Sequence, residues 1–119
     1  MDIDRRTVSY GFTKEMEEWI KRELLCFYEN AVRRICLFGS RVVGDYEEES
    51  DLDVLCVVDA TGCEVNNLFC DALDIMDEFF YLYDIPIDLI LVDREQYERD
   101  RYVNMLFRNI DNEGIVLYG

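Results

Sequence analysis

Histidine is absent from this sequence of 119 residues, and proline occurs once. Zinc sites in proteins are usually built from histidine and closely spaced cysteine pairs. No two of the five cysteines form such a pair, so we expect no zinc site. Their odd number, and their placement mostly inside apolar patterns, indicate reduced, buried thiols in a cytoplasmic protein. These cysteines are Cys26, Cys36, Cys56, Cys63 and Cys70.

Basic residues are also scarce. Lysine and arginine number 12 against 27 aspartates and glutamates, which gives a net charge of −15. Because phosphate backbones are bound through surplus positive charge, we expect no direct nucleic-acid partner. A free nucleotide can still bind, since metal ions neutralise its phosphates locally. The acidic surplus fits either solubility or a basic protein partner.

Long apolar runs are missing as well. No segment has the length needed to span a membrane, and no signal peptide is visible, so we expect no membrane partner. Half of the residues are nevertheless hydrophobic, which indicates a folded chain. The length predicts one domain over residues 1–119 with a single modest core.

Apolar runs and periodic patterns predict four strands and three main helices. The strands are expected over 32–38, 52–58, 86–92 and 115–118. The helices are expected from Thr13 to about Phe27, over 64–83 and over 93–108, after a loosely packed lead-in at 1–12. Helical spacing places Phe80 in the core, together with Tyr97, Tyr102, Met105 and Leu106.

The stretch between the first two strands carries the main chemical signal. Gly39 and Ser40 break the first strand, and a glycine followed by a hydroxyl at the start of a short helix is suited to holding phosphate. Asp51 and Asp53 stand at the head of the second strand, and their spacing places both side chains on one face. Adjacent carboxylates repel unless a cation lies between them, which favours Mg²⁺.

A third carboxylate interrupts the next apolar run. Asp88 lies within the strand predicted over 86–92. A carboxylate in a buried strand costs free energy unless it is paired or bound to metal.

Gly39-Ser40, ten intervening residues and then Asp51-x-Asp53 resemble the signature of the polymerase-β-like nucleotidyltransferases. The short chain resembles their minimal branch, whose pattern also matches at Arg41, Gly44, Ser50 and Leu52. Val42 and Val43 depart from that pattern, because a small residue and often a basic one are common there. The resemblance implies an α+β fold with helices packed on a mixed β-sheet.

The resemblance also implies a site. Asp51, Asp53 and Asp88 would be the catalytic, metal-binding residues for two Mg²⁺ ions, with Asp88 helping to deprotonate the acceptor hydroxyl. Gly39 and Ser40 would cradle the β- and γ-phosphates of ATP. Arg41 is a weaker candidate for the same phosphates, and Ser50 completes the expected nucleotide-binding set.

Each of these residues also has a structural interpretation. Asp51 could cap a strand entry, Asp53 could face solvent, Asp88 could be satisfied by backbone donors, and Gly39-Ser40 could be a turn. The charged run over 45–49 is expected to be a solvated surface that points away from the phosphate site, with partner docking as the alternative.

The resemblance extends to the antitoxin half of toxin–antitoxin systems. Such a protein would transfer AMP from ATP to a tyrosine of a HEPN-type ribonuclease toxin. Two alternatives stay open at this point. The chain could neutralise its partner by binding without catalysis, or it could modify a small-molecule hydroxyl, although enzymes of that second kind usually carry an additional helical domain.

Overall fold

The computed structural model describes residues 11–60 and 62–119, without the side chains of residues 62, 63 and 66. Most of the lead-in predicted at 1–12, and residue 61 shortly before the second predicted helix, lie outside the described residues. The end of the lead-in is packed and not loose, since Phe12 is buried and the Gly11 amide donates to the Arg41 carbonyl over 2.7 Å.

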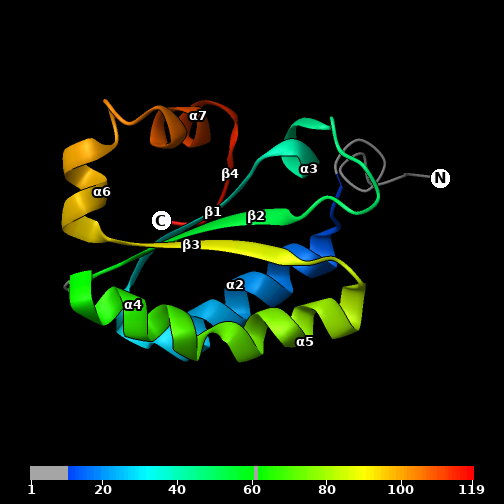
Figure 1. Cartoon of the computed structure of the whole chain (residues 1–119), viewed down its shortest axis with the longest axis horizontal. Helices are drawn as coiled ribbons and strands as arrows, with labels where there is room; N and C mark the ends of the chain where they lie inside the picture. The colour runs from blue at the N-terminus through cyan, green and yellow to red at the C-terminus, as the bar shows by residue number, and fades with distance from the viewer. Residues whose placement is uncertain (1–10, 61) are drawn as a thin grey trace.

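Four strands form one mixed sheet in the order β3-β2-β1-β4 (Figure 1). The strands are β1 (Val32–Phe38), β2 (Leu52–Val58), β3 (Ile87–Asp93) and β4 (Ile115–Tyr118). β1 pairs antiparallel with β2 and β4, whereas β2 and β3 run parallel. The predicted strands are confirmed, with β3 displaced by one residue.

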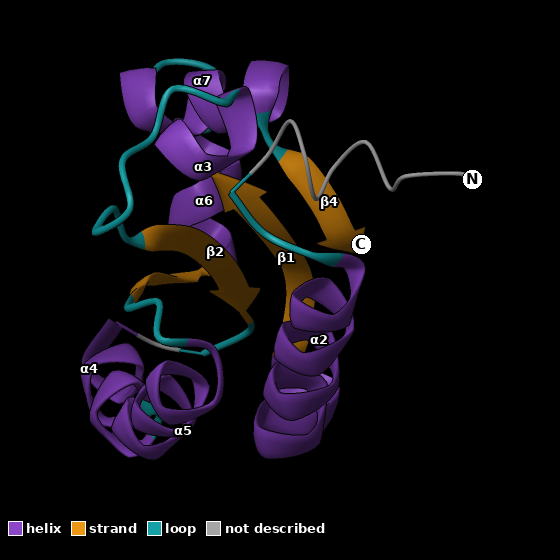
Figure 2. Cartoon of the chain, turned by 90° about the vertical axis from the view of Figure 1, so that its right-hand side faces the viewer, coloured by secondary structure: helices purple, strands orange, loops and turns teal. Residues whose placement is uncertain are grey.

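Helices cover both faces of the sheet. α2 (Lys14–Tyr28), α4 (Gly62–Asp71) and α5 (Leu73–Tyr83) lie side by side on one face, as Figure 2 shows, and the short η1 (Glu29–Ala31) follows α2. α6 (Arg94–Asp100) and α7 (Met105–Glu113) lie on the other face. The four-residue α3 (Ser40–Val43) lies on that same face, where β2 and β3 begin. The predicted α+β architecture is confirmed.

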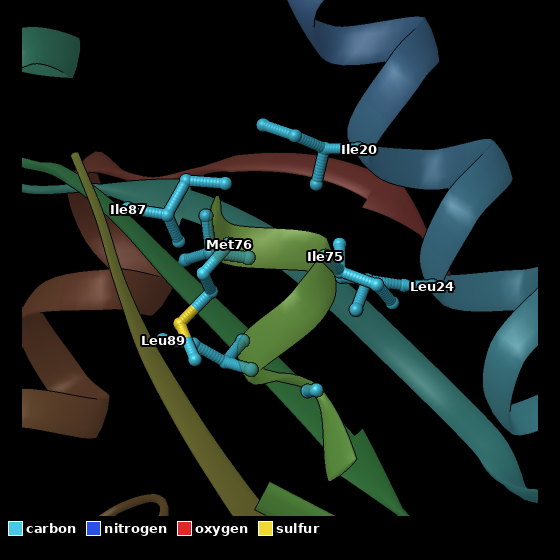
Figure 3. Close-up of a pocket in the computed structure, with 8 residues that line it drawn as sticks. Ile20, Leu24, Ile75, Met76, Ile87 and Leu89 are labelled. Atoms are coloured by element: carbon cyan, nitrogen blue, oxygen red, sulfur yellow. The ribbon is translucent and has the colours of Figure 1, made fainter. Parts of the chain in front are cut away.

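Alternation along the strands creates two cores. On β2, Leu52, Val54, Cys56 and Val58 pack toward α2 and α5, while Leu55 and Val57 pack toward α6 and α7. Figure 3 shows the first core, where Ile20 and Leu24 of α2 meet Ile75 and Met76 of α5 and two residues of β3. The space that these side chains enclose is about 10 Å³, so it is a packed seam and not a substrate site.

The helix predicted over 64–83 is two helices. The chain turns at the fully buried Ala72, between α4 and α5. The Tyr28 hydroxyl donates to the Leu68 carbonyl over 2.7 Å, and the Ala72 amide reaches that same carbonyl only at 3.2 Å. A side chain that competes for a helical carbonyl in this way loosens the ladder and bends the helix.

The helix predicted over 93–108 also ends early. Asn104 caps a new helix by accepting the Phe107 amide, so Phe107 and Ile110 enter the second core. Tyr97 is buried as predicted, but Tyr102, Met105 and Leu106 are exposed, and Phe80 of α5 is 49% exposed. These four core assignments were wrong because helical spacing was extended through two breaks.

The cysteine prediction holds in part. Cys36 and Cys56 are buried free thiols on β1 and β2, and burial raises the pKa of each. Cys26 and Cys70 are free but exposed, and the Cys63 side chain lies outside the described residues. No helix in the described part of the chain is both long enough and apolar enough to cross a membrane.

Candidate active site

Two aspartates meet on neighbouring strands. Asp53 of β2 is the direct cross-strand partner of Asp88 of β3. Leu55 and Val57 follow Asp53 at two-residue steps, and Ile90 and Val92 follow Asp88 in the same way; all four pack in the second core. Both carboxylates therefore project from that same face of the sheet.

The environment of Asp53 favours its protonated form. Burial, followed by the charges of Asp88 and Asp51 and a hydrogen bond with Asp88, together raise the pKa of Asp53 from its ordinary 3.8 to about 6. Asp53 is half-buried, whereas Asp51 and Asp88 are exposed. The arrangement concentrates negative charge at one end of the sheet.

Gly39 closes over this carboxylate. It follows β1, whose last residue, Phe38, pairs with Asp53, and it has a φ of 83°. A Cβ built on Gly39 would overlap Asp53 Oδ2 and lie 2.9 Å from Asp53 Cγ. This position therefore requires glycine for two reasons, the positive φ and the close approach of the carboxylate.

α3 starts directly beyond this contact. The Gly39 carbonyl accepts the amides of Val42 and Val43 at 3.0 and 3.1 Å, which fixes the turn. Ser40 is half-buried at the first position of α3. The structure therefore brings Gly39 and Ser40 to the end of the sheet that carries Asp53 and Asp88.

The start of β2 is fixed from its other side. The Leu52 amide donates to the Pro86 carbonyl over 2.8 Å, and Leu52 pairs with Ile87. This link sets the register that places Asp53 opposite Asp88.

Arg41 has a structural role that the sequence analysis missed. Its side chain is buried, with the residue 5% exposed, and its guanidinium donates to the carbonyls of Ser50 at 2.7 Å, Glu48 at 2.8 Å and Gly11 at 2.9 Å. The guanidinium also lies 4.9 Å from the centre of the Tyr46 ring. Because its donors are used by the loop, we do not assign it to phosphate. The sequence feature that could have indicated this structural role is the position of the arginine directly after Gly39-Ser40.

Ser50 is also engaged within the loop. Its hydroxyl accepts the Glu47 amide over 2.9 Å, and its own amide donates to the Glu47 carbonyl over 3.1 Å. Ser50 therefore shapes the approach to Asp51, and its contact with a nucleotide stays a prediction.

The facing carboxylates of Asp53 and Asp88, with Asp51 nearby, are suited to binding magnesium. Across residues 11–60 and 62–119, no three histidine, cysteine or acidic side chains stand close enough together to hold a metal ion. Asp53 and Asp88 nevertheless face each other, and Asp51 is near enough for its charge to act on Asp53. Mg²⁺ is commonly held by one or two carboxylates, with water and substrate phosphates completing its shell. The site offers only oxygen ligands, and a bound cation would relieve the repulsion among its carboxylates, so both features suit Mg²⁺.

The chain is similar to known nucleotidyltransferases and adenylyltransferases. The family model described as "Nucleotidyltransferase domain" matches residues 17–113. A protein of Methanocaldococcus jannaschii named "Putative protein adenylyltransferase MJ0604" is 35% identical over 92 residues, which cover 76% of this chain and 83% of that protein. A second protein of that organism, "Putative protein adenylyltransferase MJ0141", is 41% identical over 44 residues, covering 37% of this chain and 44% of that protein.

Solved structures agree on the fold. A structure described as a toxin–antitoxin with AMP-PNP has a TM-score of 0.54 and 21% identity, and the match covers 87% of this chain and 73% of that one. A toxin–antitoxin MntA–HpeT mutant has a TM-score of 0.53 and 20% identity, with the same coverage of both chains. Taken with the family match, these likenesses establish that the chain belongs to the nucleotidyltransferase domain family, has its polymerase-β-like fold and is a transferase.

Proposed function

We propose that this chain is a Mg²⁺-dependent protein adenylyltransferase that acts as an antitoxin. It would transfer AMP from ATP to a tyrosine of a HEPN-type ribonuclease toxin. The observation that carries the proposal is the facing pair Asp53 and Asp88, with Gly39 packed against Asp53. The name of the 35% identical relative supports protein as the acceptor class, and the toxin–antitoxin fold neighbours support the biological setting.

The residues divide into two groups by role. Asp53 and Asp88, with Asp51, would hold the metal, and two Mg²⁺ ions would neutralise the triphosphate and the charge that develops during transfer. The Gly39–Ser40 turn would position the β- and γ-phosphates, because it lies against Asp53 at the same end of the sheet. Arg41 and Ser50 act as positioning residues that hold the loop leading into Asp51.

The reaction follows from this arrangement. Asp88 is exposed and would accept the proton of the tyrosine hydroxyl. The phenolic oxygen forms a bond to the α-phosphorus as the bond from that phosphorus to the bridging oxygen of the β-phosphate breaks. Pyrophosphate leaves with the electron pair, and AMP stays on the acceptor. Transfers of this type depend mainly on positioning and charge neutralisation.

The test is incubation with ATP labelled at the α-phosphate, Mg²⁺ and a purified HEPN-type ribonuclease from the same genome. We expect label on the ribonuclease with the wild type and none with an Asp51→Asn/Asp53→Asn double variant. Mass spectrometry would locate the AMP on tyrosine. The matched control is Asp74→Asn, which removes an exposed carboxylate of α5 outside the site.

The alternatives give different outcomes. A non-catalytic antitoxin would inhibit the ribonuclease at equal molarity without ATP and would transfer no label. A small-molecule nucleotidyltransferase would leave the ribonuclease unlabelled but would consume ATP when an acceptor alcohol is supplied. Catalysis on the protein instead predicts inhibition below equal molarity that requires both ATP and Mg²⁺.

A further inference from the structure

An exposed apolar stripe runs along α5. Leu73 and Phe80 are spaced two helical turns apart and are each about half exposed, at 47% and 49%. Phe80 forms a wall of two adjoining hollows of about 280 and 260 Å³. Large apolar side chains that border a concavity at the surface are typical of interaction sites.

The two hollows form one groove, which we call the α5 groove. Phe80 and Pro86 line both hollows. Glu48, Glu49 and Asp84 complete the first hollow, and Met76, Asp77 and Ile87 complete the second. The groove therefore has an apolar floor with acidic side chains around it.

The α5 groove adjoins the carboxylate pair through the backbone. Pro86 accepts the Leu52 amide and stands two residues before Asp88, and Glu49 stands two residues before Asp51. The end of α5 is fixed as well, because the Asp84 amide donates to the Phe80 carbonyl over 2.8 Å. The groove therefore lies at the same end of the sheet as the carboxylate pair, with α5 on one face and the two aspartates on the other.

Charge selects the kind of occupant. Four carboxylate side chains line the two hollows, and among residues 11–60 and 62–119 no lysine or arginine lines either of them. A triphosphate would be repelled here, and so would a second copy of a chain whose net charge is −15. A segment that presents a large apolar side chain next to lysine or arginine would pack against the apolar residues of the groove and form ion pairs with its carboxylates.

We propose that the acceptor protein docks in the α5 groove through such a basic, apolar-anchored segment, so that its hydroxyl reaches Asp53 and Asp88. This inference rests on the proposed transfer to a protein and extends it by naming the docking surface. Apolar anchors in concave sites usually carry most of the binding energy, and charged rims add selectivity and association rate. Phe80 is therefore expected to matter most, and Glu48 and Glu49 less.

The test compares Phe80→Ala with Tyr81→Ala. Tyr81 is the matched control, because it is an aromatic residue of the same helix, is 86% exposed and lines neither hollow. With the HEPN-type ribonuclease as acceptor and saturating Mg²⁺-ATP, we expect Phe80→Ala to raise the KM for the ribonuclease about tenfold. The KM for ATP stays unchanged, Tyr81→Ala behaves as wild type, and Glu48→Gln/Glu49→Gln raises the ribonuclease KM by about threefold.

Equilibrium binding of the same ribonuclease separates this inference from the proposed function. If the wild type transfers no AMP but binds the ribonuclease, and Phe80→Ala alone weakens binding about tenfold, the groove stands as the docking site and the proposed catalysis fails. Equal effects of Phe80→Ala and Tyr81→Ala, or no binding by the wild type, overturn the groove. Analytical ultracentrifugation adds one further outcome, since a wild-type dimer that Phe80→Ala dissociates would make the groove a self-association surface and also overturn the proposal.

Discussion

Gly39 sets the position of the Asp53 carboxylate, and we expect Gly39→Ala to disable the site. The new Cβ would overlap Asp53 Oδ2, and the backbone would keep a φ of 83°. Displacing a reacting group by about 1 Å commonly costs about 100-fold in rate. We expect AMP transfer to fall by about that factor, measured as initial rate with labelled ATP.

The control for Gly39→Ala is Gly44→Ala. Gly44 ends α3 with a φ of 94°, so alanine there pays a similar backbone penalty of about 1 kcal/mol at an exposed position outside the carboxylate pair. Its variant should lose stability and keep most of its transfer rate. Equal losses of rate in both variants would mean that backbone strain, and not contact with Asp53, is the cause.

Asp53 makes the metal-free protein sensitive to pH. Folding raises the pKa of Asp53 from 3.8 to about 6, so folding favours the protonated form. The stability from this group is fully present below about pH 4 and is lost as the pH rises through about 6. In chelator, Asp53→Asn should therefore have a higher Tm than the wild type at neutral pH, by a few degrees, and a weaker decline of Tm between pH 4 and 7.

Adding Mg²⁺ should reverse that order at neutral pH. The ion relieves the repulsion among the carboxylates in the wild type, and the asparagine variant lacks the charge that attracts it. Thermal unfolding with and without millimolar Mg²⁺ measures both effects, with Asp74→Asn as the control for loss of one surface charge. An equal rise of Tm in wild type and Asp53→Asn would remove Asp53 from the metal-binding residues.

At the scale of elements, the loop over residues 45–50 depends on Arg41. Arg41→Lys keeps the charge but cannot reach the carbonyls of Gly11, Glu48 and Ser50 in the directions that a planar guanidinium does. We expect a loss of about 2–4 kcal/mol in unfolding free energy, measured in urea, because buried acceptors lose charged donors.

Limited proteolysis gives the local measure for the same variant. A glutamate-specific protease should cut Arg41→Lys faster within residues 47–49 than it cuts the wild type. The matched control is Arg94→Lys, whose arginine forms surface ion pairs with Asp59 and Glu98 and should change stability far less. Unchanged cleavage of the loop in Arg41→Lys would contradict this role.

The elements differ in how far sequence predicts them. The strands were predicted closely because each is a short apolar run, with side chains that alternate between the two buried faces of the sheet. The first helix break was missed because its cause is distant in sequence: Tyr28 bonds to Leu68 from 40 residues away. The second was missed because the helical pattern of polar and apolar residues continues across Asn104, which caps α7. The facing of Asp53 and Asp88 followed from the family resemblance. The loop contacts of Arg41 were missed because its partners are carbonyls, which the sequence does not mark.

At the scale of the whole molecule, the net charge of −15 constrains the partner. A charge of this size acts over roughly one Debye length, about 30 Å in dilute salt and about 8 Å at physiological ionic strength. It attracts a basic protein and speeds its encounter, while it slows the approach of anions. The two proposed substrates, a basic ribonuclease and ATP, should therefore differ in how strongly salt affects their binding.

We expect the association rate of the ribonuclease to fall at least tenfold between about 20 and 500 mM NaCl, measured by stopped-flow fluorescence. Binding of ATP in Mg²⁺, measured under the same conditions, should weaken far less, because local metal ions already neutralise its charge. The Glu48→Gln/Glu49→Gln variant tests whether these two glutamates contribute to the electrostatic attraction. The rate at which it associates with the ribonuclease should depend less steeply on salt than the rate of the wild type. An association rate that stays constant across this range would exclude a basic partner steered by the acidic surface, and would leave apolar contact at Phe80 as the main source of recognition.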